Sequence, residues 1–382
     1  MAVGEKPGFE QRARIPSVDG LRALAFTLVF LFHSWEFAGR PRIPVVTDIV
    51  AQNTRPDLFV VLTGFALYLP FALDPSRHGR FRTGAYVERR IKRIVLPYYA
   101  ALALALVLPY VLKVIYSLLG QAPNPTDPVA WGDVASHLTF THMFFPEYWA
   151  GINGSLWTMS LEMQLYLLFP VVVLLVARWG LWALVPLSAV SVLWHVVTPF
   201  GDQWPEDFLW GATAIGRLTE FMAGMVAAVI VMRLRHRLTR RWLLAALVVF
   251  VLGYAVATGS LTGGRIPVRE VGLSVAFGGL IVLAIGAKPV EAFFGSRPVA
   301  RLGYMAYSMF LVHQPIVYYF SEGLERVLGV PEGHGELALL WSVGFAVVFV
   351  VGWLFFRFIE EPCIRWSKAV AKRPASAAST PL

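Results

Sequence analysis

Long apolar runs alternate with short polar segments along the whole chain. A run of about 17 to 25 apolar residues is long enough for an α-helix to cross the hydrocarbon core of a bilayer, and about ten runs qualify. The pattern therefore predicts an all-α integral membrane protein, a bundle of about ten transmembrane helices. The runs begin near Leu21, Thr54, Ile94, Gly154, Leu181, Phe208, Trp242, Val268, Leu302 and Ala338.

The polar segments between the runs differ in charge. Lys and Arg gather in residues 77–93, 233–241 and 288–301, whereas residues 120–153 contain neither. Because basic loops stay on the cytoplasmic side of a membrane, we expect both termini in the cytoplasm and residues 120–153 outside. Five arginines depart from this pattern, namely Arg40, Arg42, Arg55, Arg265 and Arg269.

Composition agrees with the apolar pattern and narrows the function classes. Hydrophobic residues make up 57% of the 382 residues and charged residues 15%, with a mean hydropathy of +0.61, which is too apolar for a soluble domain. The net charge of +9 indicates no nucleic-acid partner, because the basic residues fall in short loops that orient membrane helices. The single cysteine, Cys363, excludes an intrachain disulfide and a cysteine-rich metal site.

The domain organisation is simple. No internal repeat is evident, so a transporter built from duplicated halves gains no support. We expect one transmembrane domain over residues 1–368 and a small, polar, disordered cytoplasmic tail over 369–382. Within the external segment, residues 131–145 are expected to lie as an interfacial helix.

The first apolar run carries charges that a plain membrane anchor lacks. Arg22 and His33 are eleven residues apart, which returns them to one helix face about 16 Å apart along the axis. Glu36 follows His33 by three residues and joins that face. Ionisable groups in hydrocarbon are costly and mark functional sites by default. The alternative is a buried structural triad.

Two further ionisable residues are expected at the depth of His33. At about 1.5 Å per residue, His33, Glu162 and His313 each lie about 18 Å from the cytoplasmic surface. A shared level favours one site that uses all three. As alternatives, Glu162 pairs within the bundle, and His313 hydrogen-bonds a kink made by Pro315.

Other polar residues are expected near the same level. Arg217 and Glu220 are three residues apart on the sixth run, and Asp57 is expected a turn or two nearer the outer surface. These residues either belong to a site or form a purely structural ion pair. Trp157 and Tyr166, on the fourth run, are either ligand contacts or packing residues.

A cluster of cations begins the third run, at Arg89-Arg90-Ile-Lys92-Arg93. The cluster is either an orientation signal or an anion site. Two observations support the anion site. An arginine fork binds phosphate through two hydrogen bonds, and Arg90 and Arg93 have the spacing of neighbours on an α-helix.

Several short motifs follow one another along nearly the whole chain. They are Asp19-Gly-Leu-Arg22 with His33, Asp57-Leu-Phe-Val-Val-Leu-Thr63-Gly64-Phe65, Arg90-Ile-Lys-Arg93 with Pro97-Tyr98, Ser155-Leu-Trp157 with Glu162 and Tyr166, Arg217-Leu-Thr-Glu220-Phe221 with Gly224, Leu302 to Ser308 with His313 and Pro315, and Glu361-Pro362. In this order they resemble the motifs of the acyltransferase 3 family, integral membrane enzymes that acylate hydroxyl groups. Threonine stands at Thr63, where that family usually has serine.

The resemblance implies an activity and its partners. A family member of this kind would transfer an acyl group, usually acetyl, from cytoplasmic acyl-CoA to a hydroxyl of a glycan or of a glycosylated small molecule such as a macrolide antibiotic. It would be a multi-pass protein of the bacterial plasma membrane. Acyl-CoA would be a substrate, and neither a permanently bound cofactor nor a metal is expected.

The resemblance and the residue chemistry together assign roles. Histidine titrates near neutral pH and suits a general base, so we expect His33 to act as the base and Glu36 to orient it. Arg22 is expected to hold a phosphate of the donor or to steady its thioester oxygen. The predicted donor-binding residues are Arg89, Arg90, Lys92 and Arg93. The predicted acceptor-side residues are Asp57, Trp157, Glu162, Tyr166, Arg217, Glu220 and His313.

Two other function classes remain open at this point. A transporter or flippase of a glycan or lipid-linked sugar would also need charges inside the bundle, and a non-catalytic membrane partner would tolerate loss of His33. Within the enzyme reading, the membrane runs offer no cysteine, and their serines and threonines have no adjacent base in sequence. An acyl-histidine stays open, but with Glu36 one turn away His33 is better placed as a base than as a nucleophile. Direct transfer is therefore favoured over an acyl-enzyme.

Overall fold

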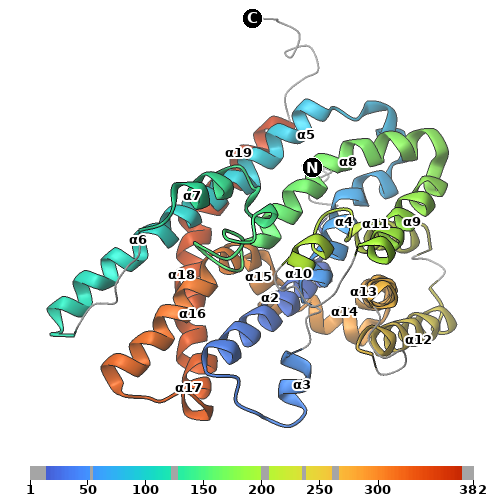
Figure 1. The fold of residues 1–382 in the computed structure, drawn as a ribbon. Coiled ribbons are helices and arrows are strands. Elements are labelled where there is room, and N and C mark those ends of the chain that lie inside the picture. Colours follow the sequence, from blue (N-terminus) through green and yellow to red (C-terminus); the bar gives the residue numbers. More distant parts are fainter. Residues whose placement is uncertain are drawn as a thin grey trace, which may run out of the picture. The chain divides into compact units, whose positions relative to one another are not determined.

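The computed structural model describes residues 14–51, 55–121, 128–198, 206–234, 238–259 and 266–371. Every regular element within these ranges is a helix (Figure 1), which confirms the prediction of an all-α protein. Arg265 and most of the expected tail, from residue 372 on, lie outside the described residues. The domain boundaries therefore stay predictions.

The chain forms two compact units, each assembled from separate stretches of sequence. Of the described residues, the first unit comprises those within 14–27, 55–80 and 171–304, and the second comprises those within 28–51, 81–170 and 305–371. Two long helices contribute residues to both units, α2 (Pro16–Phe37) and α8 (Trp157–Trp179).

The first unit is organised around three helices in mutual contact, α4 (Arg55–Leu73), α11 (Leu218–Leu234) and α13 (Ile266–Gly286). Its other helices are α9 (Leu184–Val197), α10 (Glu206–Gly211), α12 (Arg240–Ala257), α14 (Lys288–Phe294) and α15 (Arg297–Tyr304), with the short turns η1 (Pro75–Arg80) and η4 (Gly180–Ala183).

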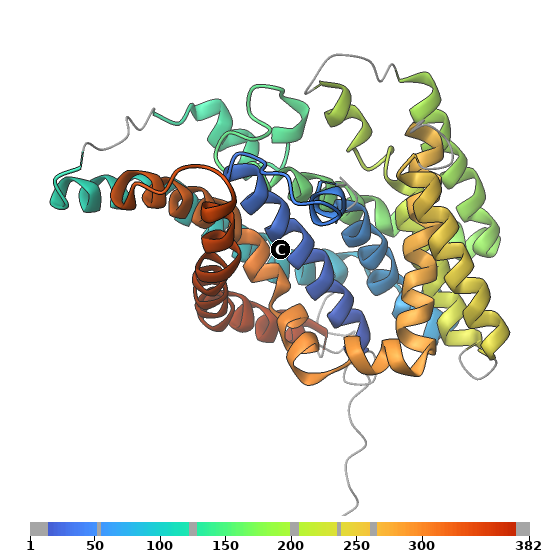
Figure 2. The same ribbon diagram turned by 90° about the horizontal axis from the view of Figure 1, so that it is seen from below.

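Glycines let these helices approach one another at backbone distance. A Cβ atom on Gly64 of α4 would lie 2.1 Å from the carbonyl oxygen of Phe221, and one on Gly224 of α11 would lie 2.0 Å from that of Val61. Helices α12 and α13 also meet through glycines and run side by side in both views (Figures 1 and 2). Small residues at such crossings are typical of helix packing in membranes.

The second unit packs α16 (Ala306–Leu328) against α18 (Phe345–Phe355) and α6 (Leu96–Leu118). Its other helices are α3 (Val46–Val50), α5 (Thr83–Arg90), α7 (Trp131–Leu138), α17 (His334–Leu339) and α19 (Glu361–Ala371), with the turn η3 (His142–Phe144) and the π turns η2 (Ile91–Val95), η6 (Leu340–Gly344) and η7 (Phe356–Glu360). The segment expected as an interfacial helix, 131–145, contains α7 and η3. Its position at a membrane surface stays a prediction.

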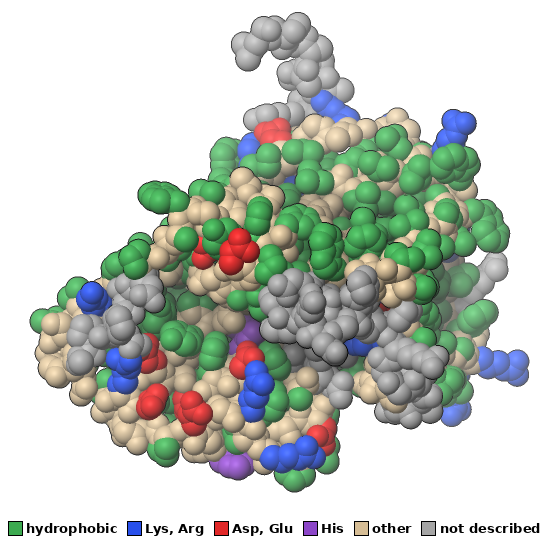
Figure 3. Space-filling view, in the orientation of Figure 1, with side chains coloured by type: hydrophobic (Ala, Val, Ile, Leu, Met, Phe, Trp, Pro, Cys, Tyr) green, Lys and Arg blue, Asp and Glu red, His purple; other side chains and the backbone are tan. Residues whose placement is uncertain are grey.

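Seven described helical segments are long and apolar enough to cross a membrane. They are Pro16–Phe37, Pro56–Leu73, Thr83–Leu118, Trp157–Val197, Arg240–Ala257, Val268–Gly286 and His334–Val370. Large apolar side chains on these segments are exposed, such as Leu118 (81%) and Trp182 (82%), and apolar side chains cover much of the face shown in Figure 3. Extensive apolar exposure suits lipid rather than water, so the chain is a multi-pass membrane protein.

The predicted number of spans, about ten, stays a prediction, as does the orientation of the termini. Two of the expected spans, α11 and α16, are not among the seven segments. Helix α11 has 17 residues, and α16 carries Glu322, Glu325 and Arg326 in its second half. The segment Trp157–Val197 contains two expected spans, α8 and α9.

Candidate active site

His33 and Glu36 meet near the end of α2. Nδ1 of His33 lies 3.2 Å from Oε2 of Glu36, and both side chains are partly exposed, at 15% and 29%. Because a carboxylate only accepts hydrogen bonds, Nδ1 carries the proton, and Nε2 of the neutral ring keeps its lone pair. Nη2 of Arg40 donates to the other carboxylate oxygen at 2.9 Å. Glu36 is therefore held from two sides in an orientation that suits a histidine base.

His313 is a neighbour of His33, as their expected common depth suggested. The two ring centroids are 5.3 Å apart, and His313 is fully buried. Its Nδ1 donates to the carbonyl oxygen of Phe310 at 2.6 Å. This bond fixes the ring orientation and leaves the lone pair of the neutral ring on Nε2.

Pro315 lies inside α16, and the backbone beside it is hydrogen-bonded to the segment that precedes α8. Pro315 lacks the N–H group that would bond the carbonyl oxygen of Leu311, and Nδ2 of Asn153 donates to that oxygen at 3.4 Å. Oε1 of the adjacent Gln314 accepts the backbone N–H of Ser155. Asn153 thus bonds the carbonyl that Pro315 leaves without its helical donor, while His313 bonds the preceding carbonyl, that of Phe310.

Sequence reasoning missed Arg40, Asn153 and Gln314 as parts of this region. Arg40 follows Glu36 by four residues, a spacing that predicts an ion pair on a helix. Asn153 and Gln314 gave no comparable signal, because they meet partners about 160 residues away along the chain.

The predicted donor-side arginine is stacked on aromatic rings. The guanidinium carbon of Arg90 lies 5.3 Å from the ring centroids of both Tyr86 and Tyr166, and the adjacent Arg89 is half-buried. The hydroxyl of Tyr166 donates to Oε2 of Glu162 at 2.8 Å. The structure thus connects Arg90 to two residues predicted on the acceptor side.

A π turn separates Arg90 from Arg93. Helix η2 begins directly after Arg90, and residues three apart in a π turn do not align as they do in an α-helix. Arg93 is accordingly exposed, whereas Arg90 is half-buried. The ammonium of Lys92 lies 2.6 Å from Oε1 of Glu88 and 4.4 Å from the centroid of the Trp366 ring, so a phosphate would compete with an existing ion pair there.

Arg22 lies far from the histidine pair. Its Nη1 donates to Oδ1 of Asp19 at 2.7 Å, and Arg14 donates to Oδ2 of the same carboxylate at 2.6 Å. Eleven residues of helix α2 place Arg22 about 16 Å from His33 along the axis.

Trp157, the remaining predicted residue of the second unit, is buried at the first position of α8.

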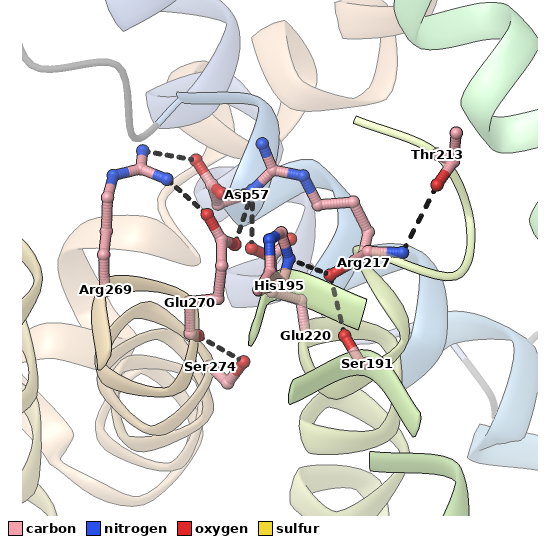
Figure 4. Close-up of polar contacts among 10 residues, drawn as sticks. Asp57, Ser191, His195, Thr213, Arg217, Glu220, Arg269, Glu270 and Ser274 are labelled. Carbon is pink, nitrogen blue, oxygen red and sulfur yellow. Dashed lines mark hydrogen bonds and ion pairs between the residues drawn. The ribbon is translucent and has the colours of Figure 1, made fainter. Parts of the chain in front are cut away.

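The remaining predicted residues belong to the first unit and bind one another (Figure 4). Nη1 of Arg217 lies 2.9 Å from Glu220 and 2.6 Å from Glu270, and it also contacts Asp57. Arg269 lies 2.5 Å from Glu270 and 3.7 Å from Asp57. Asp57 and Glu220 are fully buried. We call these five residues the ion network. This arrangement favours the structural alternative for Arg217 and Glu220, and it adds Asp57, Arg269 and Glu270 to that pair.

Three carboxylates of the ion network have the spacing of metal ligands. One oxygen each from Asp57, Glu220 and Glu270 lies within 4.8 Å of the others. The guanidinium of Arg217 contacts all three and so occupies the position that a cation would take. These residues, as arranged, do not fit a metal ion.

A second pair of neighbouring histidines, both of them buried, lies outside the membrane-spanning segments. The rings of His137 and His142 stack with centroids 3.9 Å apart and planes 4° from parallel. Nε2 of His142 donates to the carbonyl oxygen of Leu156 at 3.0 Å. Burial, reinforced by the nearby His137, lowers the pKa of His142 to about 3. His142 therefore stays neutral at physiological pH, and its hydrogen bond ties its own segment to the carbonyl of Leu156.

Comparison with known proteins adds a second kind of observation. A family model described as an acyltransferase domain matches residues 15–357. The chain is 23% identical to the peptidoglycan O-acetyltransferase OatA of Listeria monocytogenes, over 92% of this chain and 56% of the relative. It is 26% identical to acyltransferase MdmB of Streptomyces mycarofaciens, over 96% of both chains. The O-acetyltransferase OatA of Staphylococcus aureus is 21% identical, over 91% of this chain and 57% of the relative.

These matches differ in how much of each relative they cover. The chain spans just over half the length of the two OatA relatives and nearly the full length of MdmB. No solved structure matches the chain.

Proposed function

This chain belongs to the acyltransferase 3 family, and from that premise we propose that it moves an acetyl or similar acyl group from cytoplasmic acyl-CoA to a hydroxyl of a carbohydrate or glycosylated acceptor. The family and its O-acetyltransferase relatives support an O-acyltransferase enzyme in a membrane. The donor, the acceptor class and the bacterial plasma membrane are parts of the proposal.

The contact between His33 and Glu36 carries the proposal. Glu36 holds the proton on Nδ1, which directs the lone pair of Nε2 to the acceptor. Nε2 removes the proton of the acceptor hydroxyl while its oxygen attacks the carbonyl carbon of the thioester. The carbon–sulfur bond then breaks, and the proton passes from Nε2 to the departing CoA thiolate. Atoms and charge balance without a further reactant.

The arginines of the second unit supply the donor site in this proposal. Arg90 presents a planar guanidinium that two tyrosine rings support, and such a plane binds phosphate through paired hydrogen bonds. Arg93 is exposed and adds a second cation, with Arg89 alongside. Arg22 belongs to the first unit, and its expected contact with the phosphate or the thioester of the donor stays a prediction.

Direct transfer is the proposed route. The only cysteine, Cys363, lies on α19 at the end of the last span. His33 is oriented by a carboxylate, an arrangement typical of a base rather than of a nucleophile that must release its own acyl group. The acyl group therefore passes within a ternary complex of enzyme, donor and acceptor.

Purified protein and radiolabelled acyl-CoA test this proposal. His33→Gln should lower transfer by about 10²- to 10⁴-fold, the range of a lost general base, while acyl-CoA binding is unchanged. His334→Gln, at an exposed histidine of α17, is the matched control and should transfer normally.

Three results would contradict parts of the proposal. Label that stays covalently on the chain without acceptor, and is lost in His33→Gln, would replace direct transfer by a double displacement. Normal transfer by His33→Gln would remove the base assignment. Movement of glycan across vesicles without consumption of acyl-CoA would favour the transporter.

A further inference from the structure

The second unit contains a cavity of ≈ 460 Å³ between α6, α16 and the segment that precedes α8. This volume lies within the range of small-molecule pockets, about 300 to 1,000 Å³. Five aromatic side chains line it, together with two amides and two charged groups. They are Phe37, Tyr110, Tyr116, Tyr318 and Tyr319, then Asn153 and Gln314, then Lys113 and Glu322.

A row of aromatic rings leads from the histidine base into this cavity. The ring of His33 stacks on Phe37 at 6.3 Å between centroids. Phe37 meets Tyr318 edge to face at 5.5 Å, and Tyr318 meets Tyr319 in the same way at 4.9 Å. The first three members of the row come from two helices, α2 and α16. A ligand lying on these rings would therefore extend to His33.

The amide of Gln314 is oriented for a ligand in the cavity. Its Oε1 is held by the backbone N–H of Ser155, which fixes the plane of the amide. In the described part of the chain no acceptor is bonded to its Nε2. A Cβ atom on Gly154 would lie 3.0 Å from Nε2, so glycine leaves room for the amide to turn its hydrogens to a ligand. Gln314 also follows His313 directly in sequence.

The charges around the cavity favour a neutral ligand. Glu322 is paired with Arg326 at 3.0 Å, so its carboxylate is already neutralised. Lys113 is exposed, so its side chain is not enclosed by the cavity. A purely apolar ligand, such as an acyl chain, would bury the tyrosine hydroxyls and the amide without hydrogen bonds, which is costly. Flat rings beside amide donors instead suit a molecule with apolar C–H faces and hydroxyl edges.

We propose that this cavity is the acceptor subsite and that its ligand is a neutral monosaccharide unit. One C–H face of the sugar lies on Phe37 and Tyr318, a hydroxyl accepts a hydrogen bond from Nε2 of Gln314, and a second hydroxyl reaches Nε2 of His33. The inference rests on the proposed function for the role of His33. It adds where the acceptor binds and which acceptor chemistry is selected.

Binding without donor tests the subsite separately from catalysis. Protein in lipid nanodiscs is titrated with methyl β-D-glucopyranoside and with methyl N-acetyl-β-D-glucosaminide, and saturation-transfer NMR gives Kd. Tyr318 is 44% exposed, so truncation there leaves no core cavity. Tyr318→Ala should weaken binding by about three- to tenfold, whereas Tyr318→Phe keeps the ring and should change Kd less than about twofold.

A second variant addresses the amide. Gln314→Glu keeps an oxygen for the N–H of Ser155 and removes the Nε2 donor, so we expect Kd to rise by about three- to tenfold. Tyr254→Ala, on α12 of the first unit, is the control and should bind like the unchanged protein. Lys113→Gln should also bind normally, because the proposed ligand is neutral.

Several outcomes would overturn the subsite. They are an unchanged Kd in both Tyr318→Ala and Gln314→Glu, displacement of the glycoside by palmitate, and stronger binding of glucose 6-phosphate that depends on Lys113. None of these affects the test of the proposed function. Conversely, normal transfer by His33→Gln would remove the proposed function while sugar binding in the cavity persists.

Discussion

The ion network of the first unit and the histidine site of the second unit use similar residues in opposite ways. In the ion network, three carboxylates and two arginines neutralise one another, and Arg217 contacts all three carboxylates. At the histidine site, His33 and Glu36 are partly exposed and adjoin a row of aromatic rings that leads into a cavity. One cluster is closed by its own contacts, and the other is open to a ligand.

The difference shows how ionisable residues in a membrane protein divide between structure and function. A buried charge is tolerated when partners surround it, and removal of one partner leaves the others uncompensated. Such a cluster has little capacity left for a substrate. A half-exposed pair costs less to maintain, and a histidine oriented by a carboxylate suits proton transfer. We therefore interpret the ion network as structural and the histidine site as catalytic.

The largest effect is expected from Arg217→Met. It leaves Asp57, Glu220 and Glu270 without their shared partner, and breaking a buried ion pair costs about 3 to 5 kcal/mol. We expect little folded protein, measured by size-exclusion chromatography and thermal unfolding. Arg40→Gln, which breaks the ion pair of an exposed arginine with Glu36, is the control and should cost about 0 to 1 kcal/mol.

One result would reverse this comparison. If Arg217→Met folds like the unchanged protein but fails to bind or acylate its acceptor, the ion network belongs to the substrate site, as the sequence first suggested.

Arg90→Ala should have the next largest effect. Loss of a charge-assisted phosphate contact costs about 1.5 to 3 kcal/mol, so KM for acyl-CoA should rise about tenfold or more while KM for the acceptor changes little. Arg90→Lys should rescue only part of this loss, because an ammonium lacks the planar fork. Equal KM values for acyl-CoA in all three proteins would leave the cluster as an orientation signal alone.

Glu36→Gln tests orientation of the base and should lower kcat by about 10- to 100-fold, the cost typical of a lost orienting partner. Glutamine retains a hydrogen-bonding oxygen for Nδ1 of His33 but removes the charge. Thermal stability should stay unchanged, since Glu36 is 29% exposed. Glu325→Gln, at an exposed position on α16, is the control. Full activity of Glu36→Gln would show that another group orients His33.

Local patterns predicted much of this architecture, and long-range contacts account for what they missed. The apolar runs predicted the helices, and the spacing of three residues predicted the contact between His33 and Glu36. In contrast, Glu270 and Arg269 complete the ion network from α13, 53 residues beyond Arg217 in the case of Glu270. Arg269 was visible only as a cation in an unexpected loop. Its partners depend on packing of α13 against α4 and α11.

Irregularities of the helical backbone are a second feature that the sequence did not predict. An ideal α-helix places Arg90 and Arg93 on one face, but the π turn η2 rotates them apart. The sequence Ile91 to Val95 carries no signal for such a turn. Pro315 indicates a helix carbonyl without its N–H donor, but the group that bonds this carbonyl, Asn153, lies 158 residues away in the sequence and gave no local signal.

The smallest effect is expected at the stacked pair of His137 and His142, a third cluster that is closed like the ion network. The pKa of His142 is lowered to about 3 in the folded protein, while an unfolded histidine titrates near 6.5. Between these two pH values the unfolded state binds a proton at this histidine and the folded state does not. The free energy of unfolding therefore falls as the pH drops below about 6.5, and it levels off near pH 3. The slope for one group is at most about 1.4 kcal/mol per pH unit.

His142→Gln can keep a donor for the carbonyl of Leu156 and removes this titration, so its thermal midpoint should fall less between pH 7 and pH 5 than that of the unchanged protein. His334→Gln, at an exposed histidine, should follow the unchanged protein. Parallel curves for all three proteins would mean that His142 takes up a proton in the folded state, and that the closed clusters of this protein tolerate charge more readily than their burial indicates.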